Sequence, residues 1–248
     1  MKRNISSQLK LAYNNASNDY NSSRYGFPGG RLFKDFSNQI AVDILTELSS
    51  RSSNDLVVLD FATGTGKLAF AIREIPGISR VVGLDISRGM LSQATSSPDN
   101  NEGGILWVNG NGLRLPFDDC TFDHIISFKF LHIMENTHHY NFLVELHRVL
   151  KPGGRLIIDC SNGIFGIFIS IKRLKRWRNN ARFYWPHHRY TLYRDFSIVE
   201  IIGEWFPFTG LWYRISPFLS DSINRIARET PLKYLCGKLI LVFERTAI

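Results

Sequence analysis

The stretch 56–69, LVVLDFATGTGKLA, constrains the fold more than any other part of the chain. Its first six residues are apolar apart from Asp60, and so short an apolar run is typical of a strand buried on both faces. Gly64 and Gly66 then predict a tight turn, and the residues from Lys67 onward predict a helix. Because the first turn of a helix carries unpaired N–H donors and partial positive charge, this arrangement predicts a site for a nucleotide-type cofactor.

The glycines alone leave the type of cofactor open. Gly64-x-Gly66-x-x-Ala69 satisfies the dinucleotide pattern, and Asp85 follows at the spacing of an acid that binds ribose. Asp60, however, ends the first strand where the pyrophosphate of a dinucleotide would lie, and two like charges in a partly dry site cost several kcal/mol. S-adenosylmethionine carries a sulfonium and an ammonium group and no phosphate, so a carboxylate suits it. The structural alternative for Asp60 is a turn-capping role.

Strands and helices alternate along the rest of the chain. Residues 80–85 predict a strand that ends at Asp85, where an acid can accept from both ribose hydroxyls. The alternative role for Asp85 is the N-cap of a helix that begins near Arg88, although Ser87 is the better-placed cap. This alternation predicts an α/β fold with a parallel sheet and right-handed crossovers. The other predicted strands are 104–108, 122–128, 155–160, 197–206 and 239–243, and the other predicted helices are 36–48 and 141–150, the latter ended by the Lys-Pro-Gly-Gly sequence at 151–154.

Polar and apolar residues follow several of these strands. Asn111 can accept a hydrogen bond from an adenine amino group while a neighbouring backbone N–H donates to the ring. Its alternative role is an ordinary Asn-Gly turn. Ligands of parallel sheets bind at the carboxyl ends of the strands, so we expect Asp60, Asp85, Asn111 and Phe128 to converge there.

Composition limits the class of protein. The 248 residues are 44% hydrophobic, which suits one α/β domain with an appendage, or two domains at most. Cys120, Cys160 and Cys236 lack metal-ligand spacing and are odd in number, so we expect neither a metal site nor a disulfide framework. The N-terminal residues lack the apolar core of a signal peptide, and the apolar run 164–171 is too short to span a bilayer. We therefore expect a cytoplasmic protein.

The net charge of +8 is concentrated between Cys160 and Arg194, where eight basic residues occur without an acid. Such a cluster favours an anionic partner, which could be a membrane surface, an acidic small molecule or nucleic acid, although a solvated helix face is the alternative. Residues 164–178 place an apolar stretch beside a basic one, with Trp177 at the junction. This composition is typical of an interfacial helix on anionic lipid, and the alternative is a helix that packs on the sheet.

Four segments, LDFATGTGKLA, VVGLDISRGML, LRLPFDDCTFDHI and RVLKPGGRLII, resemble the successive motifs of class I S-adenosylmethionine-dependent methyltransferases, in the same order and spacing. The resemblance covers roughly residues 12–160 and is greatest to the branch that includes the ubiquinone and menaquinone biosynthesis C-methyltransferases. It implies a Rossmann-like, mostly parallel seven-stranded sheet flanked by helices, with an N-terminal helical lid at 1–50, a cofactor-binding core at 51–161 and a substrate-side region at 162–248.

The resemblance also implies a set of cofactor contacts. Gly64 and Gly66 would lie under the methionine part of S-adenosylmethionine, Asp60 would hold its ammonium group, and Asp85 would bind the ribose. The segment Ala16-x-x-x-Tyr20-x-x-x-Arg24 resembles the lid motif that approaches the methionine carboxylate. The implied cofactor-binding residues are Tyr20, Arg24, Asp60, Ala62, Gly64, Gly66, Asp85, Ile86, Met90, Asn111, Gly112 and Phe128.

Two positions depart from the family pattern. Asn111 replaces the usual Asp, which weakens the expected adenine contact, and residues 128–132 do not match the quinone enzymes, so quinone specificity does not transfer. Methyl transfer needs no metal, but the acceptor may need to lose a proton. His132 is the first candidate base, followed by His187 and His188, and a structural role is the alternative for each.

We therefore expect methyl transfer to a small hydrophobic, aromatic or lipid-like acceptor, with membrane contact through 164–178. An RNA or other nucleic-acid methyltransferase that uses the basic residues at 172–194 ranks second, because the chain lacks an Asp/Asn-Pro-Pro-aromatic box and a Pro-Cys nucleophile. An NAD(P)-dependent oxidoreductase ranks third because of Asp60, and a catalytically silent scaffold is a further alternative. The sequence specifies no oligomeric state.

Overall fold

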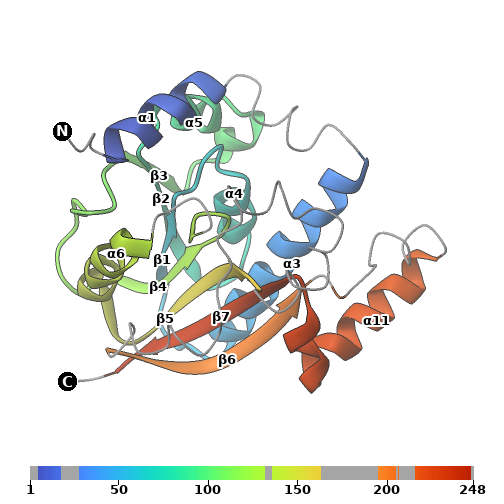
Figure 1. Ribbon diagram of the computed structural model, residues 1–248. Helices are drawn as coiled ribbons and strands as arrows, with labels where there is room; N and C mark the ends of the chain where they lie inside the picture. Colours follow the sequence, from blue (N-terminus) through green and yellow to red (C-terminus); the bar gives the residue numbers. More distant parts are fainter. Residues whose placement is uncertain are drawn as a thin grey trace. The chain divides into compact units, whose positions relative to one another are not determined.

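The computed structural model describes residues 5–17, 28–131, 136–162, 195–204, 206 and 216–246. The chain divides into two compact units, one of residues 1–128 and 141–155 and the other of residues 129–140 and 156–248. Seven strands form a sheet in the order β3-β2-β1-β4-β5-β7-β6 (Figure 1). The predicted mostly parallel, Rossmann-like α/β sheet is therefore confirmed, while the division into parts at residues 50 and 161 stays a prediction.

Strand β1 (Leu56–Phe61) lies at the centre of the first unit. It pairs in parallel with β2 (Ile78–Asp85) on one side and β4 (Phe122–Ser127) on the other, and β3 (Ile105–Asn109) pairs in parallel with β2. Val58 and Leu59 are fully buried on opposite faces of β1, as expected for a strand covered on both sides. This confirms the strand predicted from the apolar run.

Helices occupy the segments between these strands. The predicted helix at 36–48 is longer than expected, because α3 begins at Pro28. Proline is well suited to the first position of a helix, where its missing N–H has no partner to lose. In the first unit, α1 lies against α5 (Figure 1). The helices are α1 (Ile5–Ala16), α3 (Pro28–Ser50), α4 (Lys67–Arg73), α5 (Arg88–Thr95) and α6 (Asn136–Val149), with a short 3-10 helix, η1 (Pro98–Glu102).

The boundary between α6 and β5 differs from the prediction. The Lys-Pro-Gly-Gly sequence was expected to separate them, but β5 (Leu150–Ser161) follows α6 directly and includes those four residues. Gly153 has a φ of 75°, and a Cβ on Gly154 would lie 2.6 Å from the carbonyl oxygen of Asp123. The two glycines thus let the chain bend out of the helix and approach β4 closely without an intervening loop.

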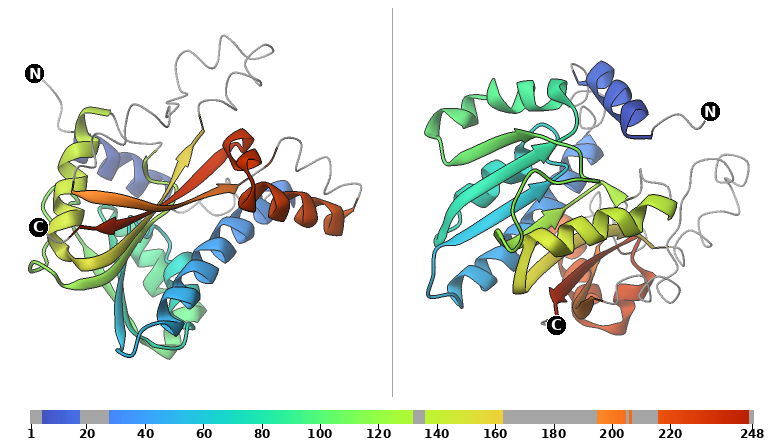
Figure 2. Two further views of the ribbon diagram at one scale, coloured as in Figure 1. Left: turned by 90° about the horizontal axis from the view of Figure 1, so that it is seen from below. Right: turned by 90° about the vertical axis from the view of Figure 1, so that its left-hand side faces the viewer.

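The second unit contains the antiparallel pair β6 (Phe196–Glu204) and β7 (Lys238–Arg245), which lie side by side in the left view of Figure 2. Helix α11 (Pro217–Glu229) and a 3-10 helix, η5 (Pro231–Leu235), connect them. These strands correspond to the last two strands expected from the sequence, at 197–206 and 239–243. None of the described helices is both long enough and apolar enough to cross a membrane.

Candidate cofactor site

Asp60 is a buried carboxylate at the carboxyl end of β1. It is 2% exposed and lies between Gly83 of β2 and Ile126 of β4 in the sheet register. Its carboxylate accepts from the hydroxyl of Thr63 at 2.5 Å and from the backbone N–H of Ala69 in α4. Burial raises the pKa of Asp60 to about 7, the Thr63 hydrogen bond acts against this rise, and the charge of Asp85 adds to it. Asp60 therefore braces the turn, as the structural alternative proposed, and is also poised to change charge near neutral pH.

The turn after β1 is built from residues in the left-handed region. Ala62, Gly64 and Gly66 have φ values of 61°, 58° and 77°. A left-handed alanine is strained by roughly 1–2 kcal/mol, and such strain is concentrated at functional sites. Two backbone hydrogen bonds hold the turn, one from Thr63 N–H to the Leu84 carbonyl at 3.0 Å and one from Gly66 N–H to the Thr63 carbonyl at 3.1 Å. The turn is thus fixed to β2 by its own backbone hydrogen bonds.

The two glycines of the turn have different surroundings. A Cβ on Gly66 would lie 2.4 Å from the ring of Trp107 in β3, and a Cβ on Gly83 would lie 2.6 Å from the same ring. Nothing lies within 4 Å of the corresponding position on Gly64. Gly66 is therefore required by packing against Trp107, whereas the Gly64 backbone presents an open face that a ligand could approach.

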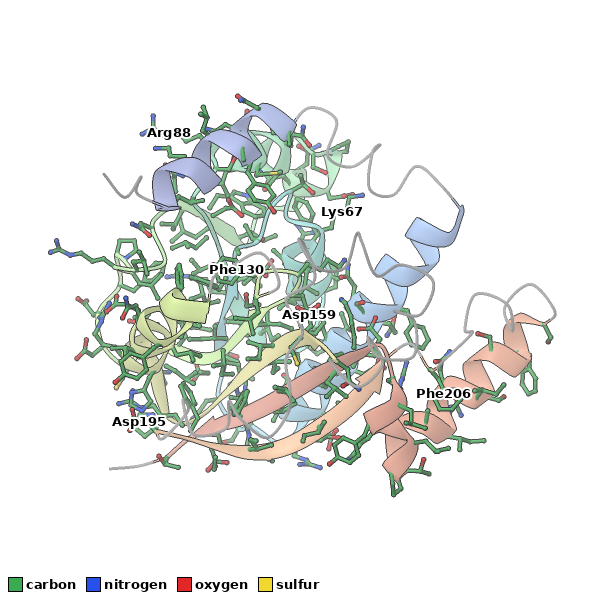
Figure 3. All side chains as sticks on the ribbon, in the orientation of Figure 1. Lys67, Arg88, Phe130, Asp159, Asp195 and Phe206 are labelled. Atoms are coloured by element: carbon green, nitrogen blue, oxygen red, sulfur yellow. The ribbon has the colours of Figure 1, made fainter. Side chains whose placement is uncertain are left out.

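Asp85 ends β2 and joins the same turn. It is 8% exposed, and its two oxygens accept from Gly64 N–H at 2.9 Å and Ser87 N–H at 2.8 Å. Burial raises the pKa of Asp85, and these N–H donors act against the rise. Ser87, the predicted cap, accepts from Met90 N–H at 3.2 Å at the start of α5. Figure 3 marks Lys67 and Arg88, the first residues of the two helices that begin beside these acids.

A third segment, after β3, completes the arrangement. The side-chain amide of Asn109 donates to the carbonyls of Asp85 and Ile86, both at 3.0 Å. Asn111 is exposed, and its side-chain oxygen accepts from Leu113 N–H at 3.1 Å, which is the turn role given above as its alternative. Its contact with adenine stays a prediction. A Cβ on Gly112 would lie 2.4 Å from the Phe61 ring, so packing explains this glycine.

The remaining predicted residues fall into two groups. Ala62 and Ile86 are half-buried, while Met90 and Phe128 are 1% and 8% exposed and belong to the core. Their contacts with a cofactor stay predictions. The second group lies outside the described residues, together with the 164–178 and 172–194 segments; it comprises Tyr20, Arg24, His132, His187 and His188.

The sequence did not indicate several residues that the structure brings to this site. Thr63 bonds Asp60, Trp107 covers two glycines, and Asn14 of α1 bonds to Ser87. Asn14 and Ser87 are 73 residues apart, so no local pattern could have paired them. In the part of the chain that the structure describes, no group of three His, Cys, Asp or Glu side chains could hold a metal ion.

These groups fit a cationic nucleoside better than a diphosphate. Two buried acids, Asp60 and Asp85, stand at the ends of neighbouring strands, and each raises the cost of a further negative charge. A positively charged ligand would lower the pKa of both. Asp85 retains acceptor capacity beyond its two backbone bonds, since an ionised carboxylate has about four lone-pair sites.

Comparison with known proteins agrees with this geometry. Residues 58–154 match the family of methyltransferase domains. The demethylmenaquinone methyltransferase of Thermus thermophilus is 35% identical over 119 residues, which are 48% of this chain and 50% of that protein. The chain thus matches the curated relatives over about half of their length.

Two solved structures share the fold over nearly the whole chain. The magnesium protoporphyrin IX methyltransferase of Synechocystis PCC 6803 with bound SAH has a TM-score of 0.67 at 15% identity and covers 98% of this chain and 100% of its own. The [4+2]-cyclase SpnF has a TM-score of 0.68 at 17% identity, with 98% and 97% covered. At these identities the likeness concerns the fold alone. Residues 58–154 thus match a methyltransferase domain, and this part of the chain resembles the S-adenosylmethionine-dependent methyltransferases of ubiquinone and menaquinone biosynthesis.

Proposed function

We propose that this protein transfers a methyl group from S-adenosylmethionine to a small hydrophobic acceptor of the quinone type. The observation that carries the proposal is the pair of buried acids at the turn with the open Gly64 backbone: Asp85 accepts from Gly64 N–H, and Asp60 accepts from the Thr63 hydroxyl. Asp60 would face the methionine ammonium, and Asp85 would accept from the ribose hydroxyls. The nicotinamide alternative is disfavoured by Asp60, whose carboxylate would lie beside the pyrophosphate of a dinucleotide.

The chemistry makes modest demands on the protein. S-adenosylmethionine, when bound, would supply a methyl group on a sulfonium: the acceptor atom would attack the methyl carbon in line, and the S–CH3 bond would break to release the neutral thioether S-adenosylhomocysteine. The residues of the chain bring the two reactants into line and exclude water, which can lower the barrier by roughly 7–11 kcal/mol. The acceptor loses a proton where its nucleophilic atom carries one, and His132, His187 and His188 are the proposed bases, in that order.

The proposed acceptor class is supported by the relatives. Those that match the core include demethylmenaquinone and 2-phytyl-1,4-naphthoquinone methyltransferases. Residues 128–132 depart from the quinone enzymes, so the exact acceptor is expected to differ from theirs. The second candidate function, RNA methylation through 172–194, predicts salt-sensitive RNA binding. Absence of such binding would exclude it.

A hydrophobic acceptor of the quinone type would partition into a membrane, so the enzyme would meet it at the membrane surface. We propose that residues 164–178, with their apolar and basic halves, make that contact. Sedimentation with phosphatidylglycerol vesicles, but not with phosphatidylcholine vesicles, is the expected result. Equal recovery with both lipids, or with neither, would refute this part of the proposal.

Isothermal titration calorimetry tests the cofactor. The wild type should bind S-adenosylmethionine and not NAD, and Asp60→Asn should weaken binding about tenfold or more, which is about 1.4 kcal/mol or more. Asp118→Asn, at an exposed acid, is the matched control and should bind like the wild type. Binding of NAD in place of S-adenosylmethionine would overturn the proposal.

The Asp60 carboxyl adds a pH signature to the same titration. Its pKa of about 7 in the free protein should fall when a cation binds beside it, so binding at pH 6.5 should release a proton and affinity should rise toward pH 7.5. Titrations in buffers of different ionisation enthalpy measure this release, and Asp60→Asn should abolish it. Transfer of a labelled methyl group to a short-chain demethylated naphthoquinone then tests the reaction.

A further inference from the structure

The last turn of α1 supplies a capping group to α5. The side-chain oxygen of Asn14 accepts from the Ser87 hydroxyl at 2.7 Å and from Gly89 N–H at 3.2 Å. The Ser87 hydroxyl in turn accepts from Met90 N–H at 3.2 Å. Two of the N–H groups that a helix leaves unpaired at its start are thereby satisfied, one by Ser87 and one by a residue of a distant helix.

A second set of contacts holds the same end of α1. The side chain of Gln93 donates to the Ser17 carbonyl, and Ser17 donates to the Asn14 carbonyl at 2.8 Å. A Cβ on Gly89 would lie 2.6 Å from the Ser17 hydroxyl, so this glycine permits the close approach. Ser17 is 4% exposed, whereas Leu11 on the preceding turn is 63% exposed. The contact with α5 is therefore made by the carboxyl end of α1.

Ser87 connects this docking to the cofactor site. Its backbone N–H donates to Asp85 at 2.8 Å, and its hydroxyl donates to Asn14 at 2.7 Å. Ser87 is fully buried; its bond to Asp85 is made away from water, and its bond to Asn14 is part-buried. A ligand that fixes the Asp85 carboxylate fixes Ser87, and a fixed Ser87 favours the docked position of α1.

We propose, resting on the function proposed above, that Asn14 is a positioning residue that couples the docking of α1 to cofactor binding at Asp85. The coupling is reciprocal, because the free energy by which the cofactor favours docking equals that by which docking favours the cofactor. Asn14 itself touches no reacting atom. Its effect passes through Ser87 and the start of α5.

The test uses the full chain and S-adenosylhomocysteine as the ligand. Hydrogen exchange of the α1 amides and calorimetric affinity are measured for the wild type, Asn14→Ala and Asn14→Asp. Asn15→Ala is the matched control, because Asn15 is the exposed neighbour of the same residue type. In the wild type the ligand should slow α1 exchange. Asn14→Ala should exchange faster, lose the slowing by ligand, and bind about fivefold or more weakly.

The conservative variant separates coupling from a folding defect. Asn14→Asp keeps an acceptor oxygen and should restore both affinity and ligand-dependent protection, while Asn15→Ala should match the wild type. Gln93→Ala, which removes the second tie to α1, should give an intermediate result. An Asn14→Ala protein that binds like the wild type would overturn the coupling and leave the proposed function standing. A wild type that does not bind the ligand would overturn both.

Discussion

Gly64 and Gly66 lie two residues apart in one turn, and at each the structure requires glycine for a different reason. Both have positive φ values, but only the Gly66 position is closed by a neighbour, the Trp107 ring. Gly103 offers a comparison elsewhere, since it has a φ of 71° and open space around it. Substitutions at these positions therefore report on different effects: Gly103 on backbone conformation, Gly66 on packing against Trp107, and Gly64 on the approach of a ligand.

Alanine substitutions at the three glycines should therefore differ in their effects on stability and on cofactor binding. Gly64→Ala should lose about 1–2 kcal/mol of unfolding free energy from its positive φ. Gly103→Ala should lose about 1–3 kcal/mol, because a φ of 71° with a ψ of −156° is a conformation essentially restricted to glycine. Gly66→Ala should lose about 1–3 kcal/mol more, because its Cβ meets the Trp107 ring. Only Gly64→Ala should combine a folded domain with weakened S-adenosylmethionine binding. Urea denaturation and calorimetry measure the two effects, and unchanged affinity in Gly64→Ala would contradict the open face.

The sequence predicted those site residues whose position follows from their immediate neighbours in the chain. Asp60 and Asp85 each end an apolar strand, so their place at the sheet edge followed from strand position alone. Asn14 and Trp107 act on partners in other elements, and their roles depend on packing that no local pattern encodes. At Gly112 the Phe61 ring explains why the position is glycine, while the predicted contact of Gly112 with adenine stays a prediction.

Among the elements of the second unit, β5 and β7 are tied by a buried ion pair. Asp159 is 2% exposed and accepts from the Lys238 ammonium and from Lys129 N–H, both at 2.6 Å. Lys129 follows β4 with a φ of 62°, a strained conformation for lysine. Figure 3 shows Asp159 toward the carboxyl end of β5. The Asp159 carboxylate on β5 thus binds both Lys238 of β7 and the strained backbone at Lys129.

Removing that carboxylate should be costly. Asp159→Ala should lose about 3–5 kcal/mol of unfolding free energy, because Lys238 would keep its charge in a buried setting. The double variant Asp159→Asn with Lys238→Met should lose less than the sum of its single variants. Glu47→Gln, which breaks the exposed pair with Arg51, is the control and should cost under about 1 kcal/mol. Strict additivity in urea denaturation would contradict a coupled pair.

Most helices and strands of residues 56–160 could be predicted because the spacing of apolar residues and the positions of glycine and proline indicate the same elements. The predicted ends of elements were wrong where proline or glycine is compatible both with an interruption and with a regular element. Pro28 resembles an interruption but begins α3, and the glycines after Pro152 resemble a loop but lie within β5. Pro28 can begin a helix because its missing N–H has no partner to lose at that position. The glycines lie within β5 because they approach the neighbouring strand β4 closely, which a local pattern does not contain.

Two buried titratable groups of the first unit, His124 and Asp60, make opposite contributions to the way the protein's stability changes with pH. Burial lowers the pKa of His124 in β4 to about 4, and its ring accepts from Arg155 N–H at 3.2 Å. The folded state therefore binds fewer protons than the unfolded state between pH 4 and 6.5, and stability from His124 grows as pH rises. Asp60, with its pKa raised from 3.8 to about 7, binds more protons when folded, so its contribution falls as pH rises.

Single variants should reveal the two opposing slopes. At 1.36 kcal/mol per pKa unit, the difference in unfolding free energy between the wild type and His124→Asn should grow by about 3 kcal/mol from pH 4 to 6.5. The difference between the wild type and Asp60→Asn should shrink by about 4 kcal/mol from pH 4 to 7. Urea denaturation followed by circular dichroism across this range measures both. A pH-independent difference for either variant would show that the group titrates alike in the folded and unfolded chain, which for Asp60 would also remove the expected proton release on cofactor binding.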